Sequence, residues 1–180
     1  MQSMRARESD GRRGQTLVEI MIAIAFLTLT LCGITGSIVA SDRLRGVNRE
    51  TALAQQGVRA ALEALNGIPF PTVFASYNST TADDPVGATS PGANFAVRGL
   101  SAVPGDPDGF PGEISFPTLD SGGLLLLRED IADPALGMPQ DLNGDAIDSL
   151  DHAGDYRILP VRVRVRWSGA TGVRVITMET

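Results

Sequence analysis

A run of about 22 residues without a charged side chain, from Ile20 to Ser41, limits what this chain can fold into more than any other feature. At 1.5 Å per residue, a helix of that length crosses a hydrocarbon core of roughly 30 Å. The segment before it, 1–14, is polar and holds four arginines against two acids, which is typical of a cytoplasmic flank. The run therefore predicts a membrane-spanning helix.

Two export signals offer alternative interpretations of the same residues. A secretory signal is cut after its apolar region, and Ile38-Val39-Ala40 follows the small-x-small cleavage pattern only poorly. Arg12-Arg13 also suggests a twin-arginine signal, but Gly14-Gln15-Thr16 and a glutamate follow it. Both interpretations stay open, and both fit the residues less well than a retained helix.

Glu19 is a carboxylate at the start of this apolar segment, where a charge at the helix centre would cost about 2.5 to 3.5 kcal/mol. One interpretation is that Glu19 is an interfacial residue that lies among the lipid headgroups. Residues 14–20, Gly-Gln-Thr-Leu-Val-Glu-Ile, resemble the signature of the type IV prepilin and type II secretion pseudopilin family. The likeness rests on a glycine, a carboxylate and an apolar helix at fixed spacing.

This resemblance implies that residues 1–14 are a leader, cut by a prepilin peptidase between Gly14 and Gln15, with methylation of the new amino terminus at Gln15. Gln15 departs from the commoner Phe or Met. The resemblance also implies that Glu19 neutralises the amino terminus of a neighbouring subunit. The implied partners are the peptidase, other pilin or pseudopilin subunits, the inner-membrane assembly platform and the lipid bilayer. The implied location is the bacterial inner membrane, single-pass with a periplasmic head, and then the filament.

Apolar residues continue at spacings of three and four beyond the membrane segment, which predicts an amphipathic helix. The apolar stripe is Leu44, Val47, Thr51, Ala54, Val58, Ala61, Leu62 and Leu65, and the polar face is Arg43, Arg45, Arg49, Glu50, Gln55, Gln56, Arg59 and Glu63. Asn66-Gly67 with Pro69 is a stop signal. We expect a membrane helix over 15–41, its amphipathic continuation over 42–66 and a globular head over 67–180.

The head is expected to be rich in loops and β-strands. Short strands are predicted at 94–97 and 113–116. The leucine run 124–127 predicts a strand buried against the helix, with a short buried helix as the alternative. A clearer strand is predicted at 156–167. The turn 168–172 then leads into a final strand at 173–178. The predicted fold is α+β, a pilin-like long helix packed on a small antiparallel sheet. The C-terminal pattern resembles minor pilins of the V type and minor pseudopilins of the I type.

Arg162, Arg164 and Arg166 alternate along the clearest predicted strand. They form either a ladder that contacts DNA or a solvated face paired with carboxylates. A net charge of −6 and the lack of interleaved aromatic residues favour the second interpretation. We do not expect a nucleic acid among the partners.

An acidic segment near the C-terminus predicts a Ca²⁺ loop, with Asp141, Asn143, Asp145 and Asp148 as ligands. The first three match the EF-hand template, but Ala146 replaces its glycine and His152 stands in place of its last glutamate. The alternative is a solvated acidic loop held by Asx turns. Some pseudopilins bind calcium in this part of the head, so the resemblance adds support.

The chain has one cysteine, Cys32, and one histidine, His152, which removes every Cys/His or Ser/His constellation that needs a second histidine or thiol and argues against an enzyme. We expect a structural subunit, a minor pilin or pseudopilin, assembled into a type IV pilus or type II secretion pseudopilus. The alternative is a membrane-anchored or exported calcium-dependent β-rich binding module.

Overall fold

The computed structural model describes the backbone of residues 12–180 and the side chains of residues 17–87 and 89–180. Most of the predicted leader, 1–11, lies outside the described residues. The chain divides into two compact units between Arg45 and Gly46, and each is described by itself.

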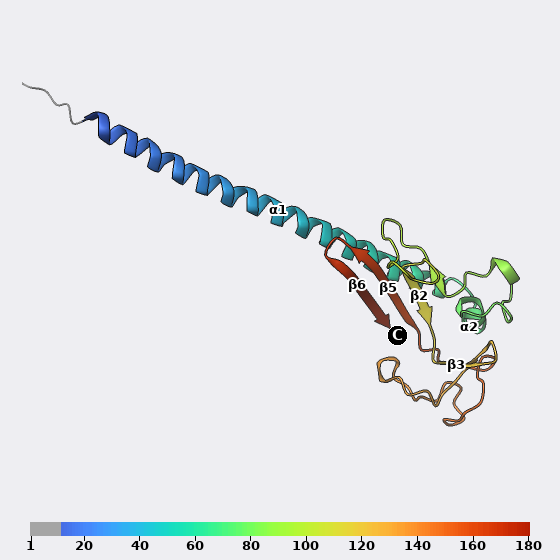
Figure 1. The fold of residues 1–180 in the computed structure, drawn as a ribbon. Coiled ribbons are helices and arrows are strands. Elements are labelled where there is room, and N and C mark those ends of the chain that lie inside the picture. Colours follow the sequence, from blue (N-terminus) through green and yellow to red (C-terminus); the bar gives the residue numbers. More distant parts are fainter. Residues whose placement is uncertain (1–11) are drawn as a thin grey trace, which may run out of the picture. The chain divides into compact units, whose positions relative to one another are not determined.

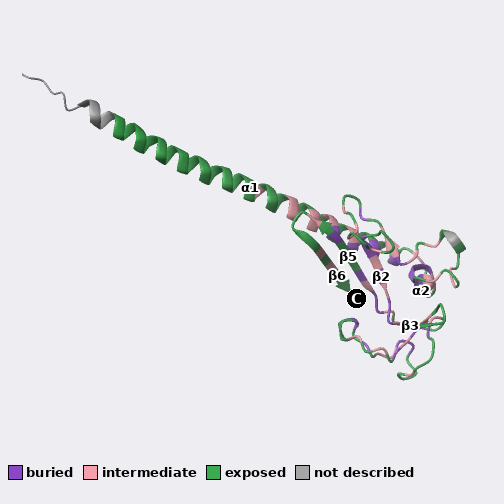
Figure 2. Cartoon of the chain, in the orientation of Figure 1, coloured by how far each residue is buried: buried purple, intermediate pink, exposed green. Residues whose placement is uncertain are grey.

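A single helix, α1 (Arg12–Asn66), contains the predicted membrane segment (Figure 1). No proline interrupts it, and the hydroxyls of Thr28, Thr30 and Thr35 donate to carbonyls of the preceding turn. Within the amino-terminal unit its large apolar side chains are exposed, from Leu17 to Val39 (Figure 2). By length and composition, α1 is compatible with a single-pass membrane anchor.

From Gly46 onward, α1 is part of the carboxy-terminal unit and supplies one wall of its core. Ala54, Val58, Ala61 and Leu65 are buried, which confirms this part of the predicted apolar stripe. Leu44, another member of the predicted stripe, lies in the amino-terminal unit and is exposed. The helix ends at Asn66, and the Gly67 N–H donates to the carbonyl of Ala64.

The carboxy-terminal unit is built on a four-stranded antiparallel sheet in the order β1-β2-β5-β6. The strands are β1 (Asn94–Phe95), β2 (Gly112–Ser115), β5 (Arg162–Gly169) and β6 (Gly172–Glu179). Val163, Val165 and Trp167 alternate along β5 and are buried in one core with Ile114 and the helix residues. A long helix packed on a small antiparallel sheet confirms the predicted α+β fold.

Smaller elements complete the unit. A second, two-stranded sheet pairs β3 (Thr118–Ser121) with β4 (Leu124–Leu127). The short helix α2 (Val73–Tyr77) and three 3-10 turns, η1 (Phe70–Thr72), η2 (Gly87–Thr89) and η3 (Pro134–Leu136), lie in the connecting segments.

Two strand predictions need correction. The strand expected from residue 156 begins only at Arg162, because Pro160 has no N–H for a ladder and the Tyr156 hydroxyl donates to the carbonyl of Phe70. The strand at 124–127 exists, but it pairs with β3, and only Leu127 is fully buried while Leu124 is exposed. The leucine run is thus not a strand buried against the helix.

Glu50, expected on the polar face of the helix, instead holds the tip of the β5–β6 hairpin. Its carboxylate accepts hydrogen bonds from the Trp167 indole N–H at 3.2 Å and from the Ala170 backbone N–H at 3.3 Å. A Cβ on Gly169 would collide with the same carboxylate. The sequence prediction failed here because the partners of Glu50 lie more than a hundred residues along the chain.

Candidate functional site

The first group of predicted site residues lies at the start of α1. Gly14 and Gln15 fall in its first turn, and their side chains are outside the described ones. Glu19 is exposed, with exposed Val18 and Ile20 beside it. No hydrogen bond or ion pair joins Glu19 to another side chain of residues 17–87 or 89–180. The structure therefore presents a carboxylate on an apolar, uncovered helix surface.

The second group lies in the segment 141–155, which folds into a tight loop. Asp141 accepts hydrogen bonds from the backbone N–H of Gly144 at 2.6 Å and of Ala146 at 3.2 Å. Asn143 Oδ1 accepts one from the Asp145 N–H at 3.1 Å. Ala146 has a φ of 102°, a left-handed conformation that favours glycine. The backbone thus takes a glycine-type conformation at the template's glycine position, although the residue there is alanine.

Glu129 lies at the centre of this loop and was missed by the sequence analysis. Its side chain is fully buried, and it accepts hydrogen bonds from the backbone N–H of Leu142 at 2.6 Å and of Asp148 at 3.2 Å. Single carboxylate oxygens of Glu129, Asp141 and Asp145 lie within 4.8 Å of one another. The neighbouring sequence does not indicate that Glu129 is buried, because Arg128-Glu129-Asp130 is typical of a charged surface turn.

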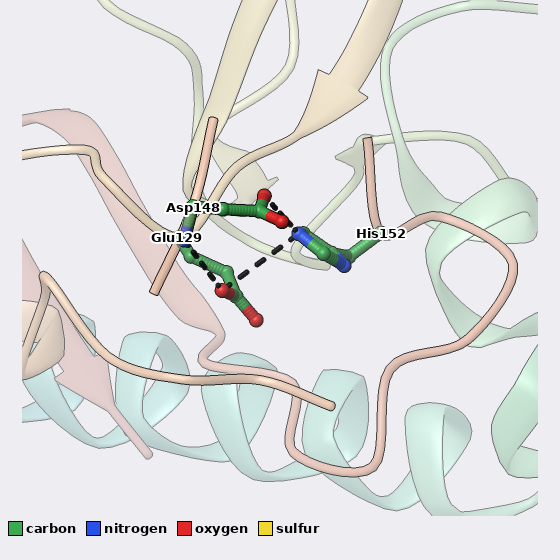
Figure 3. Close-up of side chains that lie close together, drawn as sticks. All are labelled: Glu129, Asp148 and His152. Atoms are coloured by element: carbon green, nitrogen blue, oxygen red, sulfur yellow. Dashed lines mark hydrogen bonds and ion pairs between the residues drawn. The ribbon is translucent and has the colours of Figure 1, made fainter. Parts of the chain in front are cut away.

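His152 forms the other side of the same cluster (Figure 3). It is 3% exposed, with Nε2 3.0 Å from Asp148 Oδ1 and 3.7 Å from Glu129 Oε2. Its Nδ1 is 3.2 Å from Asp155 Oδ1. With a carboxylate beside each ring nitrogen, the imidazolium form is favoured, since only that form donates from both nitrogens.

The four predicted Ca²⁺ ligands do not meet at one point. Asp141 and Asp145 come together with Glu129, whereas Asp148 faces His152. Asn143 is buried, and its Nδ2 donates to Asp155 at 3.0 Å. The structure thus places two neighbouring groups of ligand atoms around one shared carboxylate, that of Glu129.

The pKa values of Asp141, Asp148 and Asp155 are lowered by hydrogen bonds to their charged forms. The Gly144 N–H lowers the pKa of Asp141, and the Leu150 N–H and then His152 lower that of Asp148. Burial acts to lower the pKa of His152. The hydrogen bond to Asp148, the charge of Glu129 and the hydrogen bond and charge of Asp155 together outweigh it, so the pKa of His152 lies above the ordinary 6.5.

This arrangement predicts a pH dependence of stability that comes from His152. Because its folded-state pKa is raised, its contribution is complete below about 6.5 and is lost as the pH rises through the folded value. We expect the free energy of unfolding to fall as the pH rises above about 6.5, and His152→Gln to flatten that fall. Chemical denaturation with a chelator, followed by fluorescence of Trp167, measures it. Equal slopes in parent and variant would contradict the assignment.

The arginines of β5 pair with carboxylates. Arg162 lies 2.8 Å from both Asp133 and Glu179, Arg164 pairs with Glu113, and Arg166 lies 3.4 Å from Asp106. This agrees with the interpretation as a solvated, paired sheet face.

Comparison of the chain with protein-family models, with curated proteins and with solved structures gives no match.

Proposed function

We propose that this chain is a minor pilin or pseudopilin, cut between Gly14 and Gln15 and assembled through its long helix into a pilus or pseudopilus. The observation that carries the proposal is the position of Glu19. It is a carboxylate at the start of an exposed apolar helix, five residues after a glycine. The prepilin resemblance of residues 14–20 supports the same reading.

The unburied surface of α1 supports an assembly role. Large apolar side chains such as Met21, Phe26 and Leu29 are each about two-thirds exposed. Continuous apolar surface of this extent marks contact with lipid or with other proteins. In the proposed function the segment first lies in the inner membrane and later packs among the helices of other subunits.

Glu19 acquires a partner in such a helix bundle. A carboxylate moved into an apolar environment is costly when it stands alone, whereas an ammonium group nearby compensates much of that cost. Cleavage after Gly14 would create such a group at Gln15 of each subunit. The charge of Glu19 then selects subunits that have already been processed.

The experiment that tests the proposal is mass spectrometry of the N-terminal peptide, from cells with and without a prepilin peptidase. We expect a terminus at Gln15, one methyl group heavier than the bare residue, only when the peptidase is present. An intact leader, or a cut near Ala40, would refute the proposal and favour an exported or membrane-anchored binding module.

We further propose that the loop binds Ca²⁺, because the buried Glu129 adds a third carboxylate to Asp141 and Asp145. Three carboxylates gathered this closely repel one another, and a hard cation with oxygen preference relieves that repulsion. Asn143 and Asp148, the other predicted ligands, hold the surrounding loop through their hydrogen bonds.

Calcium should therefore stabilise the full chain in detergent. At a concentration a hundred times the Kd, binding contributes about 2.7 kcal/mol, which raises the Tm by several degrees. Asp145→Ala should abolish the rise, because it removes one of the three carboxylates. The variant should still fold, since the exposed Asp145 side chain accepts no hydrogen bond from another described residue. Glu63→Ala, an exposed acid on α1, is the matched control. Unfolding is followed by Trp167 fluorescence, and a parent chain indifferent to Ca²⁺ would retire the site.

A further inference from the structure

The outer strand of the main sheet, β6, has one edge of unpaired main-chain groups. Val161 and Thr180 exchange both N–H to C=O hydrogen bonds, at 2.9 and 3.0 Å. Hydrogen-bonded and non-hydrogen-bonded residue pairs alternate along an antiparallel ladder. The register with β5 therefore determines whether the backbone N–H and C=O of each β6 residue point toward β5 or away from it. The residues whose N–H and C=O point away from β5 are Val173, Val175, Thr177 and Glu179.

No strand in the described part of the chain pairs with this edge. β6 is the last strand of its sheet, and no backbone hydrogen bond from a loop reaches those four residues. Most of β6 is exposed (Figure 2), including Val173 at 60% and Val175 at 55%. The strand is eight residues long and contains neither proline nor lysine, two devices that normally protect an edge.

The charge of the hairpin indicates what kind of strand would pair there. Residues 162–179 hold four arginines against one glutamate, in a chain with a net charge of −6. Three of these arginines are in ion pairs with described carboxylates. Arg174, on β6 itself, is in none of them, and its Nη1 is buried without a hydrogen-bond partner. Arg174 is half-buried, so its charge is left for a carboxylate, the group that pairs best with a guanidinium.

We propose that the free edge of β6 binds an extended segment of another protein as a fifth strand, with an acidic side chain beside Arg174. The main-chain groups supply affinity and Arg174 supplies selectivity. A second copy of this chain fits less well, because the one acid on its own β6, Glu179, is already paired with Arg162. The surface is distinct from the apolar part of α1, so this inference does not depend on cleavage after Gly14 or on filament assembly.

The test uses the full chain in detergent micelles and three labelled synthetic peptides, with binding read by fluorescence anisotropy. One peptide alternates valine and glutamate, the second alternates valine and lysine, and the third is the first with N-methylated amides. We expect the glutamate peptide to bind about tenfold more tightly than the lysine peptide, and the methylated one not to bind. Arg174→Gln should reduce the preference for glutamate.

Val175→Pro tests the edge itself. The Val175 N–H points outward, so proline removes no bond to β5 there, and an edge strand tolerates it. We expect this variant to lose the peptide while keeping the Trp167 fluorescence of the parent. Val175→Thr, at the same exposed position, is the matched control, because it keeps the outward N–H and should keep binding.

Three outcomes would overturn the proposal. They are binding that survives Val175→Pro, equal affinity for the glutamate and lysine peptides, and no binding by the folded parent. A dimer of the parent in sedimentation velocity that Val175→Pro dissociates, without peptide binding, would assign the edge to a second copy instead. Correct N-terminal processing alongside any of these would leave the proposed function standing.

Discussion

Glu19→Ala should leave the chain inserted in the membrane but reduce its incorporation into filaments by about two to four orders of magnitude. In the proposed bundle the variant leaves a neighbouring ammonium group without its carboxylate, and removing one partner of a buried ion pair costs about 3 to 5 kcal/mol. Insertion itself should not suffer, since the change makes the segment more apolar. The measurement is the ratio of the chain in sheared filaments to that in the membrane fraction.

Two companion variants sharpen this experiment. Glu63→Ala removes an exposed carboxylate from the same helix, beyond the apolar segment, and should incorporate like the parent. Glu19→Gln keeps the size and polarity of the side chain without its charge, and we expect it to fail nearly as badly as Glu19→Ala. Normal incorporation of both Glu19 variants would show that the charge has no part in assembly.

Glu129→Ala should destabilise the carboxy-terminal unit by about 3 to 5 kcal/mol, the range found when one member of a buried charged network is removed. The backbone N–H groups of Leu142 and Asp148 would lose their acceptor, and His152 would lose one of its carboxylates. The measurement is chemical denaturation with a chelator present, so that any loss of bound metal does not contribute. Asp130→Ala, which removes the exposed neighbour, is the control.

Glu129→Gln separates the roles of charge and of hydrogen bonding. Each Glu129 carboxylate oxygen accepts a hydrogen bond from a backbone N–H. Glutamine keeps one oxygen acceptor but replaces the other with an N–H₂ group, which would face a donor with another donor. We therefore expect a loss between those of Asp130→Ala and Glu129→Ala. If Glu129→Ala unfolds at the same denaturant concentration as the parent, the buried carboxylate is not what holds the loop.

The parts of the fold that follow from nearest neighbours along the chain could be predicted from the sequence. The length and end of α1 follow from its apolar periodicity and from Asn66-Gly67, and the β5–β6 hairpin follows from alternating valines around a glycine-containing turn. The strand pairing of 124–127 was not predictable in the same way. Four consecutive leucines carry no alternation, so they do not show which face will be buried.

In the candidate site, too, residues close together in the sequence could be predicted and residues brought together by the fold could not. Asp141 and Asp145 were found because their spacing is local, whereas Glu129 reaches them only through the fold. His152 was noted as a departure from the EF-hand template, yet its three carboxylate neighbours could not be anticipated. A buried acid in a charged turn gives no sign in the sequence of the donors that it will satisfy.

The contact between Glu50 and the hairpin tip has an evolutionary consequence. Gly169 has no room for a side chain because the Glu50 carboxylate occupies that space, and the carboxylate is fixed there by Trp167. These positions should therefore vary together among descendants of this chain. A lineage that replaces Glu50 with a smaller residue is released from the need for glycine at 169, whereas a lineage that keeps Glu50 is not.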